Sequence, residues 1–172
     1  MGTSVEELAK RLGGELRRRG ATLAVAESCT GGALGAAITS VAGASDYFVG
    51  GMLAYTARAK WELLGVPAEM LAEHGAVSRE LAVAMARRMR LLARTDVAVS
   101  VTGNAGPTSD TGSREVGLVY VGVCSGGARG EAVQVAEHRF RGSRAEVQEQ
   151  AVAAALHLLV AHLTERAEAT TS

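Results

Sequence analysis

Apolar residues recur along the chain with two periods, which predict helices that alternate with short strands. An opening helix is indicated by apolar residues at helical spacing before Gly20, a typical stop signal: Val5, Leu8, Ala9, Leu12 and Leu16. The segment "ATLAVAES", residues 21–28, follows with period two. It predicts a strand with Leu23 and Val25 on one face and Ala24 and Ala26 on the other.

The remaining elements follow the same alternation. Further strands are predicted over residues 50–55, 96–103, 116–125 and 132–140, and further helices over 31–41, through Lys60 and Leu64, after Ser78, and from the capping box "SRAE" at 143–146. The apolar stripes of the last two helices are Leu81, Met85, Met89 and Leu92, and Val147, Ala151, Ala154, Leu158 and Ala161. In the strand over 96–103, Ser100 and Thr102 share one face.

Five strands interleaved with helices predict an α/β fold, a three-layer α/β/α sandwich with a five-stranded mixed sheet. The length of 172 residues suits a single domain, which we place at residues 1–165, with a polar C-terminal tail at 166–172. Hydrophobic residues make up 48% of the chain but aromatic residues only 3%. The interior must therefore be built from Ala, Val and Leu.

Charge and cysteine content narrow the class of protein. Eighteen basic residues balance eighteen acidic ones, so no overall field attracts nucleic acid or an anionic membrane. The two basic stretches, "ELRRRG" at 15–20 and "RRMR" at 87–90, favour solvated helix faces over phosphate contacts. Cys29 and Cys124 lack metal-ligand or disulfide spacing, and no signal peptide or membrane span is evident. We expect a cytoplasmic protein with no metal and no cofactor.

Two glycine-containing turns follow predicted strands and point to a shared crevice. "AESCTGG" at 26–32 and "VTGNAGP" at 101–107 both lie where ligands bind in open α/β sheets, beyond the carboxyl ends of strands. The backbone N–H groups from Thr30 to Gly32 open a helix, so we expect them to hold a phosphate or a carboxamide oxygen.

Ser28 lies in the first of these turns, but a serine hydroxyl needs a base to act as a nucleophile. The positions of the four histidines are more typical of structural or exposed residues than of a catalytic base, and their order along the chain matches no catalytic triad. Lys60 is one of only two lysines among eighteen basic residues, and a lysine can lose its proton where an arginine cannot. Composition alone favours a surface lysine at position 60, and a packed aromatic at Tyr55.

Together these segments resemble the CinA C-terminal domain family, the nicotinamide-nucleotide amidases. The resemblance covers nearly the whole chain and runs through "RGATLAVAESCTGG", "AYTARAKWELLGV", "HGAVS", "VTGNAGP" and "FRGSRAEVQEQA". Many relatives carry a further N-terminal domain, so this chain resembles a stand-alone form. The resemblance implies a metal-independent hydrolysis of nicotinamide mononucleotide to nicotinic acid mononucleotide and ammonia, in pyridine-nucleotide salvage, by a homodimer.

The resemblance also implies roles for individual residues. Ser28 corresponds to the nucleophile, Lys60 to the general base and Tyr55 to a proton-transfer partner. Cys29 is set aside as the nucleophile because the family assigns the serine. The implied substrate-binding residues are Thr30, Gly31, Gly32, Thr102, Gly103, Ala105, Gly106 and Arg144.

Four positions depart from the family pattern. Ala57 lacks a usual amide side chain, Asn104 replaces an aliphatic residue, Ser143 replaces an aspartate, and Gln148 replaces an arginine. Two alternatives therefore stay open beside the amidase: a catalytically silent nucleotide-binding or regulatory module on the same fold, and a serine amidase for a related carboxamide. In each case the expected partner is a small molecule, and neither nucleic acid nor a membrane is implied.

Overall fold

The computed structural model describes residues 3–108, 115–126 and 130–171, with side chains described to Arg166. Its strands are β1 (Leu23–Glu27), β2 (Phe48–Leu53), β3 (Val97–Gly103), β4 (Leu118–Ser125) and β5 (Ala132–Arg139). Its helices are α1 (Val5–Arg19), α2 (Ala33–Thr39), α3 (Ala57–Glu62), α4 (Ala68–His74), α5 (Arg79–Ala93) and α6 (Arg144–Thr171), with a 3₁₀ turn at Ala44–Asp46. The last helix thus continues into the segment that the sequence assigns to a polar tail.

The five strands form one mixed sheet in the order β2-β1-β3-β4-β5, as predicted. β1 pairs in parallel with β2 and β3, whereas β4 runs antiparallel to both β3 and β5. Three parallel strands therefore end at the same edge of the sheet. The turns that follow β1, β2 and β3 meet there.

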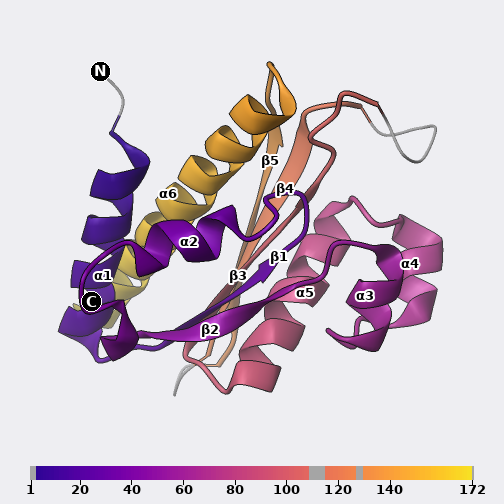
Figure 1. Cartoon of the computed structure of the whole chain (residues 1–172). Coiled ribbons are helices and arrows are strands. Elements are labelled where there is room, and N and C mark those ends of the chain that lie inside the picture. Colours follow the sequence, from indigo (N-terminus) through magenta and orange to yellow (C-terminus); the bar gives the residue numbers. More distant parts are fainter. Residues whose placement is uncertain (1–2, 109–114, 127–129, 172) are drawn as a thin grey trace.

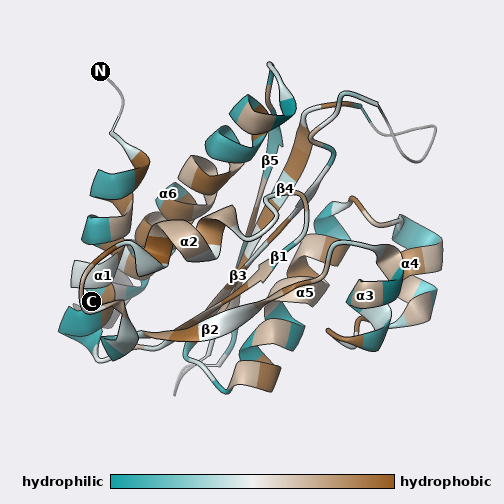
Figure 2. Cartoon of the chain, in the orientation of Figure 1, coloured by the Kyte–Doolittle hydropathy of each residue, from teal (hydrophilic) through white to brown (hydrophobic). Residues whose placement is uncertain are grey.

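Helices cover both faces of the sheet, which gives the predicted three layers (Figure 1). α1, α2 and α6 pack on one face with Leu23, Val25 and Val99, while α5 and the residues around α3 pack on the other with Ala24 and Ala98. The helices carry brown and teal bands in Figure 2, as expected for elements with one apolar side.

Close contact between α5 and the sheet depends on small and polar residues. The Ser100 hydroxyl donates to the Ala82 carbonyl at 2.6 Å, and the Thr102 hydroxyl donates to the Ala76 carbonyl at 2.6 Å. Both side chains lie on one face of β3, as the alternation predicts. At Gly122 a Cβ atom would lie 2.6 Å from the Ala82 carbonyl oxygen, so only glycine allows this approach.

The predicted stripes of the two long helices need correction at their ends. Leu92 is 48% exposed, because the buried face of α5 ends at Met89. In α6, Ala161 is exposed and Ala154 and Leu158 are only partly buried. The buried face instead includes Val152, Leu156, Leu159 and Leu163. Apolar residues occur all round this helix, so periodicity could not select the buried side.

The pattern also missed α4. This helix has seven residues, begins after Pro67 without a side-chain cap and has no fully buried residue. A short helix without a cap or an apolar stripe leaves no periodic signal in the sequence.

Candidate functional site

The turn that carries Ser28 is held between its two neighbours at the edge where the parallel strands end. The Ser28 N–H donates to the Val101 carbonyl at 3.0 Å, and the Ala54 N–H donates to the Glu27 carbonyl at 2.8 Å. The first contact continues the pairing of β1 with β3, and the second that of β1 with β2. Ser28 therefore has a fixed place between the loops after β2 and β3.

Lys60 reaches Ser28 from α3. The Lys60 Nζ lies 2.8 Å from the Ser28 Oγ and also donates to the carbonyls of Ala54 at 3.0 Å and Tyr55 at 3.4 Å. The Ser28 hydroxyl in turn donates to the Tyr55 carbonyl at 3.3 Å. Thr56 caps α3 by accepting from the Ala59 N–H, so the helix begins just after the strand and Lys60 points back to the turn. The structure thus brings Ser28 and Lys60 into direct contact.

The environment of Lys60 favours loss of its proton. Only 1% of Lys60 is exposed, and burial lowers the pKa of its ammonium group to about 8. The contacts of Nζ are a hydroxyl and two carbonyls, and the described residues provide no carboxylate within ion-pair distance. A neutral amine 2.8 Å from a hydroxyl can accept its proton. The surface-lysine alternative for Lys60 is therefore excluded by the structure.

Cys29 has a different environment, although it is adjacent to Ser28. It belongs to the apolar core, with 4% exposed, and burial raises the pKa of its thiol to about 12. The thiolate is the reactive form of cysteine. The raised pKa and the apolar surroundings therefore disfavour Cys29 as a nucleophile at neutral pH.

The backbone donors of the turn differ from the sequence-based prediction. The Gly31 N–H donates to the Ser28 carbonyl at 3.0 Å, and the Gly32 N–H donates to the buried carboxylate of Glu27 at 3.1 Å. Both groups are therefore occupied, and the expectation that they receive a ligand oxygen is wrong for this conformation. The Thr30 N–H has no partner within the described part of the chain. Thr30 Oγ1 is buried and also without one.

Glu27 is the residue that sequence reasoning overlooked. Its carboxylate is 3% exposed and accepts from the N–H groups of Gly32, Leu34 and Gly35 at 2.8–3.1 Å. It therefore satisfies the open end of α2, which the favourable interaction of an anion with a helix N-terminus reinforces. A glutamate at the end of a strand, just before two glycines and a helix, was the available signal.

Tyr55 and Arg144 form the outer rim of the site. The Arg144 Nη1 donates to the Tyr55 hydroxyl at 3.2 Å, and 52% of Tyr55 is exposed. Only the main-chain carbonyl of Tyr55 contacts Ser28 and Lys60. Arg144 lies in the first turn of α6, which begins at a capping box in which Ser143 and Glu146 bond each other's backbone N–H groups.

The loop after β3 forms the opposite wall. A cavity of about 60 Å³ is lined by Ser28, Cys29, Tyr55, Gly103, Asn104, Ala105 and Arg144. Thr102 is absent from this lining because its hydroxyl is buried and donates to the Ala76 carbonyl. The prediction that the Thr102 side chain contacts a substrate therefore needs correction. Gly106 has a φ of +76° and donates its N–H to the Asn104 side chain, which shapes the wall from behind.

Three of the departures from the family pattern have structural explanations. Gln148 donates to the Cys29 carbonyl at 2.9 Å and so supports the turn that carries Ser28. Ser143 serves as a helix cap, a position that serine and aspartate fill equally well. Asn104 accepts from the Gly106 N–H at 3.0 Å. Nothing in the structure explains Ala57, which is exposed in the first turn of α3.

Two further findings concern ligands and membranes. Among residues 3–108, 115–126 and 130–171, no group of three or more His, Cys, Asp or Glu side chains could hold a metal ion. The helices of the same part of the chain are too short or too polar to cross a membrane.

The sequence and the fold match known proteins over nearly the whole chain. The model of the CinA C-terminal domain matches residues 5–163. A CinA-like protein of Citrifermentans bemidjiense is 45% identical over 161 residues, which are 94% of this chain and 38% of the relative. The chain spans less than two fifths of the length of this and other curated relatives.

Solved structures agree in fold. A competence-damaged protein (CinA) superfamily protein from Enterobacter cloacae superposes with a TM-score of 0.89 at 33% identity, covering 95% of this chain and 94% of that protein. A competence/damage inducible protein, CihA, from Agrobacterium tumefaciens gives 0.86 at 37% identity, covering 95% and 99%.

Proposed function

Because the chain belongs to the CinA C-terminal domain family, we propose that it is an amidohydrolase that converts nicotinamide mononucleotide to nicotinic acid mononucleotide and ammonia. The observation that carries the proposal is the contact between Ser28 Oγ and Lys60 Nζ at 2.8 Å, with Lys60 buried and its pKa lowered to about 8. A hydroxyl beside a desolvated amine is the arrangement that a serine nucleophile requires.

In the proposed reaction, Lys60 acts first as a base and then as an acid. Neutral Lys60 takes the Ser28 proton while its two N–H bonds to the carbonyls of Ala54 and Tyr55 keep the amine in place. The Ser28 oxygen attacks the carboxamide carbon, and the proposed donor to the negative oxygen that forms is the N–H of Thr30, which has no partner among the described residues. The tetrahedral intermediate collapses when the protonated Lys60 returns the proton to the departing nitrogen, which leaves as ammonia.

A water molecule then completes the cycle by the same route in reverse. It attacks the acyl group on Ser28, passes a proton to Lys60 and releases the acid, while Lys60 protonates the serine oxygen. The sequence also suggests Tyr55 as a proton-transfer partner. Its hydroxyl bonds Arg144, so this role requires the phenol to turn toward the departing nitrogen when substrate binds.

The dimensions of the site support a division of the substrate between two regions. A cavity of about 60 Å³ suits the carboxamide but cannot enclose a nucleotide. The pyridine ring and the phosphate would therefore lie over the rim, against the exposed ring of Tyr55 and the guanidinium of Arg144. Arginine is well suited to bind phosphate.

A related carboxamide is the second candidate substrate. Asn104, which departs from the aliphatic residue of the family pattern, lines the cavity. Gln148, which departs from the arginine of that pattern, donates to the Cys29 carbonyl. The change at Asn104 adds a polar amide near the ligand, and the change at Gln148 removes a positive charge. If neither substrate is hydrolysed but one binds tightly, the site is a silent nucleotide-binding module.

The test is ammonia release from a panel of nicotinamide mononucleotide, nicotinamide riboside and nicotinamide, with a metal chelator present and Ser28→Ala as the matched variant. We expect ammonia from the mononucleotide with the unmodified protein alone. Release from the riboside at an equal rate would identify a related carboxamide instead. Folded protein that binds the mononucleotide without releasing ammonia would contradict the amidase proposal.

We further propose that residues 1–165 form the amidase domain, followed by the polar segment 166–172, and that the protein is a cytoplasmic homodimer. Light scattering coupled to size-exclusion chromatography tests the oligomeric state.

A further inference from the structure

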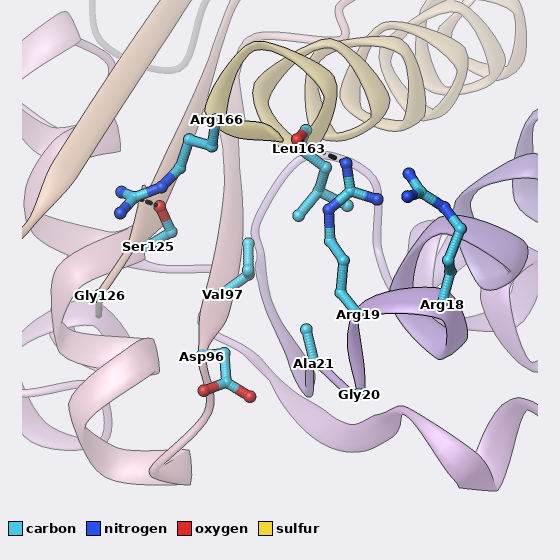
Figure 3. Close-up of a pocket in the computed structure, with 10 residues that line it drawn as sticks. All are labelled: Arg18, Arg19, Gly20, Ala21, Asp96, Val97, Ser125, Gly126, Leu163 and Arg166. Atoms are coloured by element: carbon cyan, nitrogen blue, oxygen red, sulfur yellow. Dashed lines mark hydrogen bonds between the residues drawn. The ribbon is translucent and has the colours of Figure 1, made fainter. Parts of the chain in front are cut away.

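A second and larger cavity lies at the opposite end of the sheet from Ser28. Its volume is about 430 Å³. It is bounded by the first residue of β3 and the last residue of β4, whereas Ser28 follows the last residue of β1. The lining, shown in Figure 3, is Arg18, Arg19, Gly20, Ala21, Asp96, Val97, Ser125, Gly126, Leu163 and Arg166. The two cavities share no residue.

One wall of this cavity is the basic end of α1. Arg18 and Arg19 both donate to the same carboxylate oxygen of Glu15, so their guanidinium groups are neighbours that share one negative charge. Arg19 also donates to the Leu163 carbonyl at 2.8 Å, and only 18% of its side chain is exposed. The expectation of a solvated helix face thus does not hold for Arg19. Its guanidinium is fixed between two helices at the cavity wall (Figure 3).

The other wall holds Arg166 through a buried polar network. Arg166 donates to the Ser125 hydroxyl at 2.9 Å, which lies 2.6 Å from His162 Nε2. His162 Nδ1 lies 3.0 Å from the Gln134 side-chain oxygen. Ser125 and His162 are buried, and burial together with the charge of Arg166 lowers the pKa of His162. These contacts fix the position of Arg166.

The floor combines apolar and polar surface. Ala21, Val97 and Leu163 provide apolar contacts. Asp96 accepts from the Thr22 N–H at 2.8 Å and from its hydroxyl at 2.9 Å through Oδ2. Its second oxygen, Oδ1, has no partner in the part of the chain that the structure describes. Arg18 and Arg19 share the single carboxylate of Glu15, which leaves one net positive charge at this pair.

We infer that this cavity binds a small phosphate monoester whose organic part carries hydroxyl groups. Paired guanidinium groups are suited to a phosphate because they donate several hydrogen bonds in fixed directions. The volume leaves room for an organic part over Ala21, Val97 and Leu163, and the free Asp96 oxygen accepts from a hydroxyl. The inference is independent of the proposed amidase, because it concerns other residues at the other end of the sheet.

Isothermal titration calorimetry at low salt tests the inference with three probes: inorganic phosphate, ribose 5-phosphate and adenosine monophosphate. The cavity variants are Arg19→Gln, Arg166→Gln and Ala21→Glu. The last one places a carboxylate beside the guanidinium groups without removing any of them. The control is Arg11→Gln, an exposed arginine on the same helix, and Arg144→Gln reports any binding of the probes at the Ser28 site.

We expect the two sugar phosphates to bind more tightly than inorganic phosphate. Each loss of a guanidinium should weaken binding about tenfold to hundredfold. Ala21→Glu should abolish binding in a folded protein, and the Arg11→Gln control should bind as the unmodified protein does. Tighter binding of adenosine monophosphate than of ribose 5-phosphate would identify a nucleotide as the ligand, and equal binding a sugar phosphate.

Two results would overturn the inference. One is the absence of binding by all three probes at millimolar concentration. The other is binding that is lost in Arg144→Gln but kept in the cavity variants, since the ligand would then occupy the Ser28 site. Neither result depends on ammonia release, so the outcome is separate from that of the amidase test.

Discussion

Lys60 has a charge that its surroundings do not stabilise well. Apart from the family resemblance, the sequence indicated a special role for Lys60 through scarcity, because the chain uses arginine at almost every other basic position. The structure supplies the physical reason: Lys60 is 1% exposed and lies 2.8 Å from Ser28. An arginine there would stay protonated, since its pKa is too high for burial to reverse. The choice of lysine therefore matches the requirement for a base.

The pH dependence of turnover should follow the protonation of Lys60. The neutral amine is the active form, and burial lowers the pKa of Lys60 to about 8. We expect kcat/KM to rise with pH up to about 8 and to level off above it. Steady-state ammonia release across the pH range gives this profile, with Lys60→Arg as the comparison. Substantial turnover by Lys60→Arg, or a flat profile, would contradict a base role for Lys60.

Replacement of Cys29 should have little effect on turnover. Burial raises the pKa of this thiol to about 12, and its side chain packs in the apolar core. We expect Cys29→Ala to retain most of the activity and to lose about 1–2 kcal/mol of unfolding free energy from the lost packing. Kinetics and urea unfolding of the variant check both parts. Loss of activity in a folded Cys29→Ala protein would point to the thiol as the nucleophile.

At the scale of the element, the helix that follows the Ser28 turn begins at a buried carboxylate. α2 has only seven residues, and Gly32 at its N-cap provides no side chain to accept its open N–H groups. Glu27 accepts three of them from the end of β1. The strand and the helix are thereby joined across the turn that contains Ser28, so the turn is held from both ends.

Loss of the Glu27 carboxylate should destabilise the fold. We expect Glu27→Ala to lower the unfolding free energy by about 2–3 kcal/mol, because three buried or half-buried N–H groups lose a charged acceptor. Activity should fall as well, because the Ser28 turn loses its anchor. Urea unfolding monitored by circular dichroism measures the first effect, and the control is Glu62→Ala on α3, whose side chain is 40% exposed and pairs only with the neighbouring turn, at Arg58, among the described residues. Equal stability of the two variants would show that Glu27 is not a cap.

The elements themselves were predictable, whereas several contacts at their ends were not. The alternation of side chains in β1 and β3 and the capping box of α6 predicted the strands and helices that form the three layers. The turns after β1 and β3 predicted where the crevice lies. The sequence could not show that Thr102 bonds Ala76 or that Gly32 bonds Glu27. Such contacts depend on how a loop folds back in three dimensions, and a glycine or threonine has no sequence pattern that reveals its partner.

At the scale of the whole molecule, the fold carries a buried amine that reduces its stability. Below pH 8 the charged Lys60 is desolvated in the folded chain but hydrated in the unfolded one. This penalty decreases as pH rises from 8 toward 10.5, the ordinary pKa of lysine. The remainder of the core, which is apolar on both faces of the sheet, must offset it.

The stability of the protein should therefore depend on pH through Lys60. We expect the unfolding free energy of the unmodified protein to rise relative to that of Lys60→Met by about 2–3 kcal/mol between pH 7 and pH 10. The sign follows because the unfolded chain binds the lysine proton more tightly than the folded one. Paired urea titrations at the two pH values measure this difference. A constant gap between the two proteins would show that Lys60 has an unperturbed pKa.

At the scale of the whole molecule, the Ser28 site and the cavity lined by Arg18, Arg19 and Arg166 lie at opposite ends of the sheet. The Ser28 site lies where β1, β2 and β3 end, and the arginine-lined cavity lies where β3 begins and β4 ends. The interior between them is packed with buried side chains of β1 and β3. Variants at one end are therefore expected to act independently of variants at the other.

The most direct test of the central claim measures ammonia released from nicotinamide mononucleotide at pH 8.5 by four proteins of verified fold: the unmodified protein, Ser28→Ala, Lys60→Met and Cys29→Ala. If Ser28 attacks the carboxamide and Lys60 removes its proton, the unmodified protein and Cys29→Ala release ammonia, while Ser28→Ala and Lys60→Met release none above the uncatalysed rate. Turnover by Lys60→Met close to that of the unmodified protein would contradict the claim.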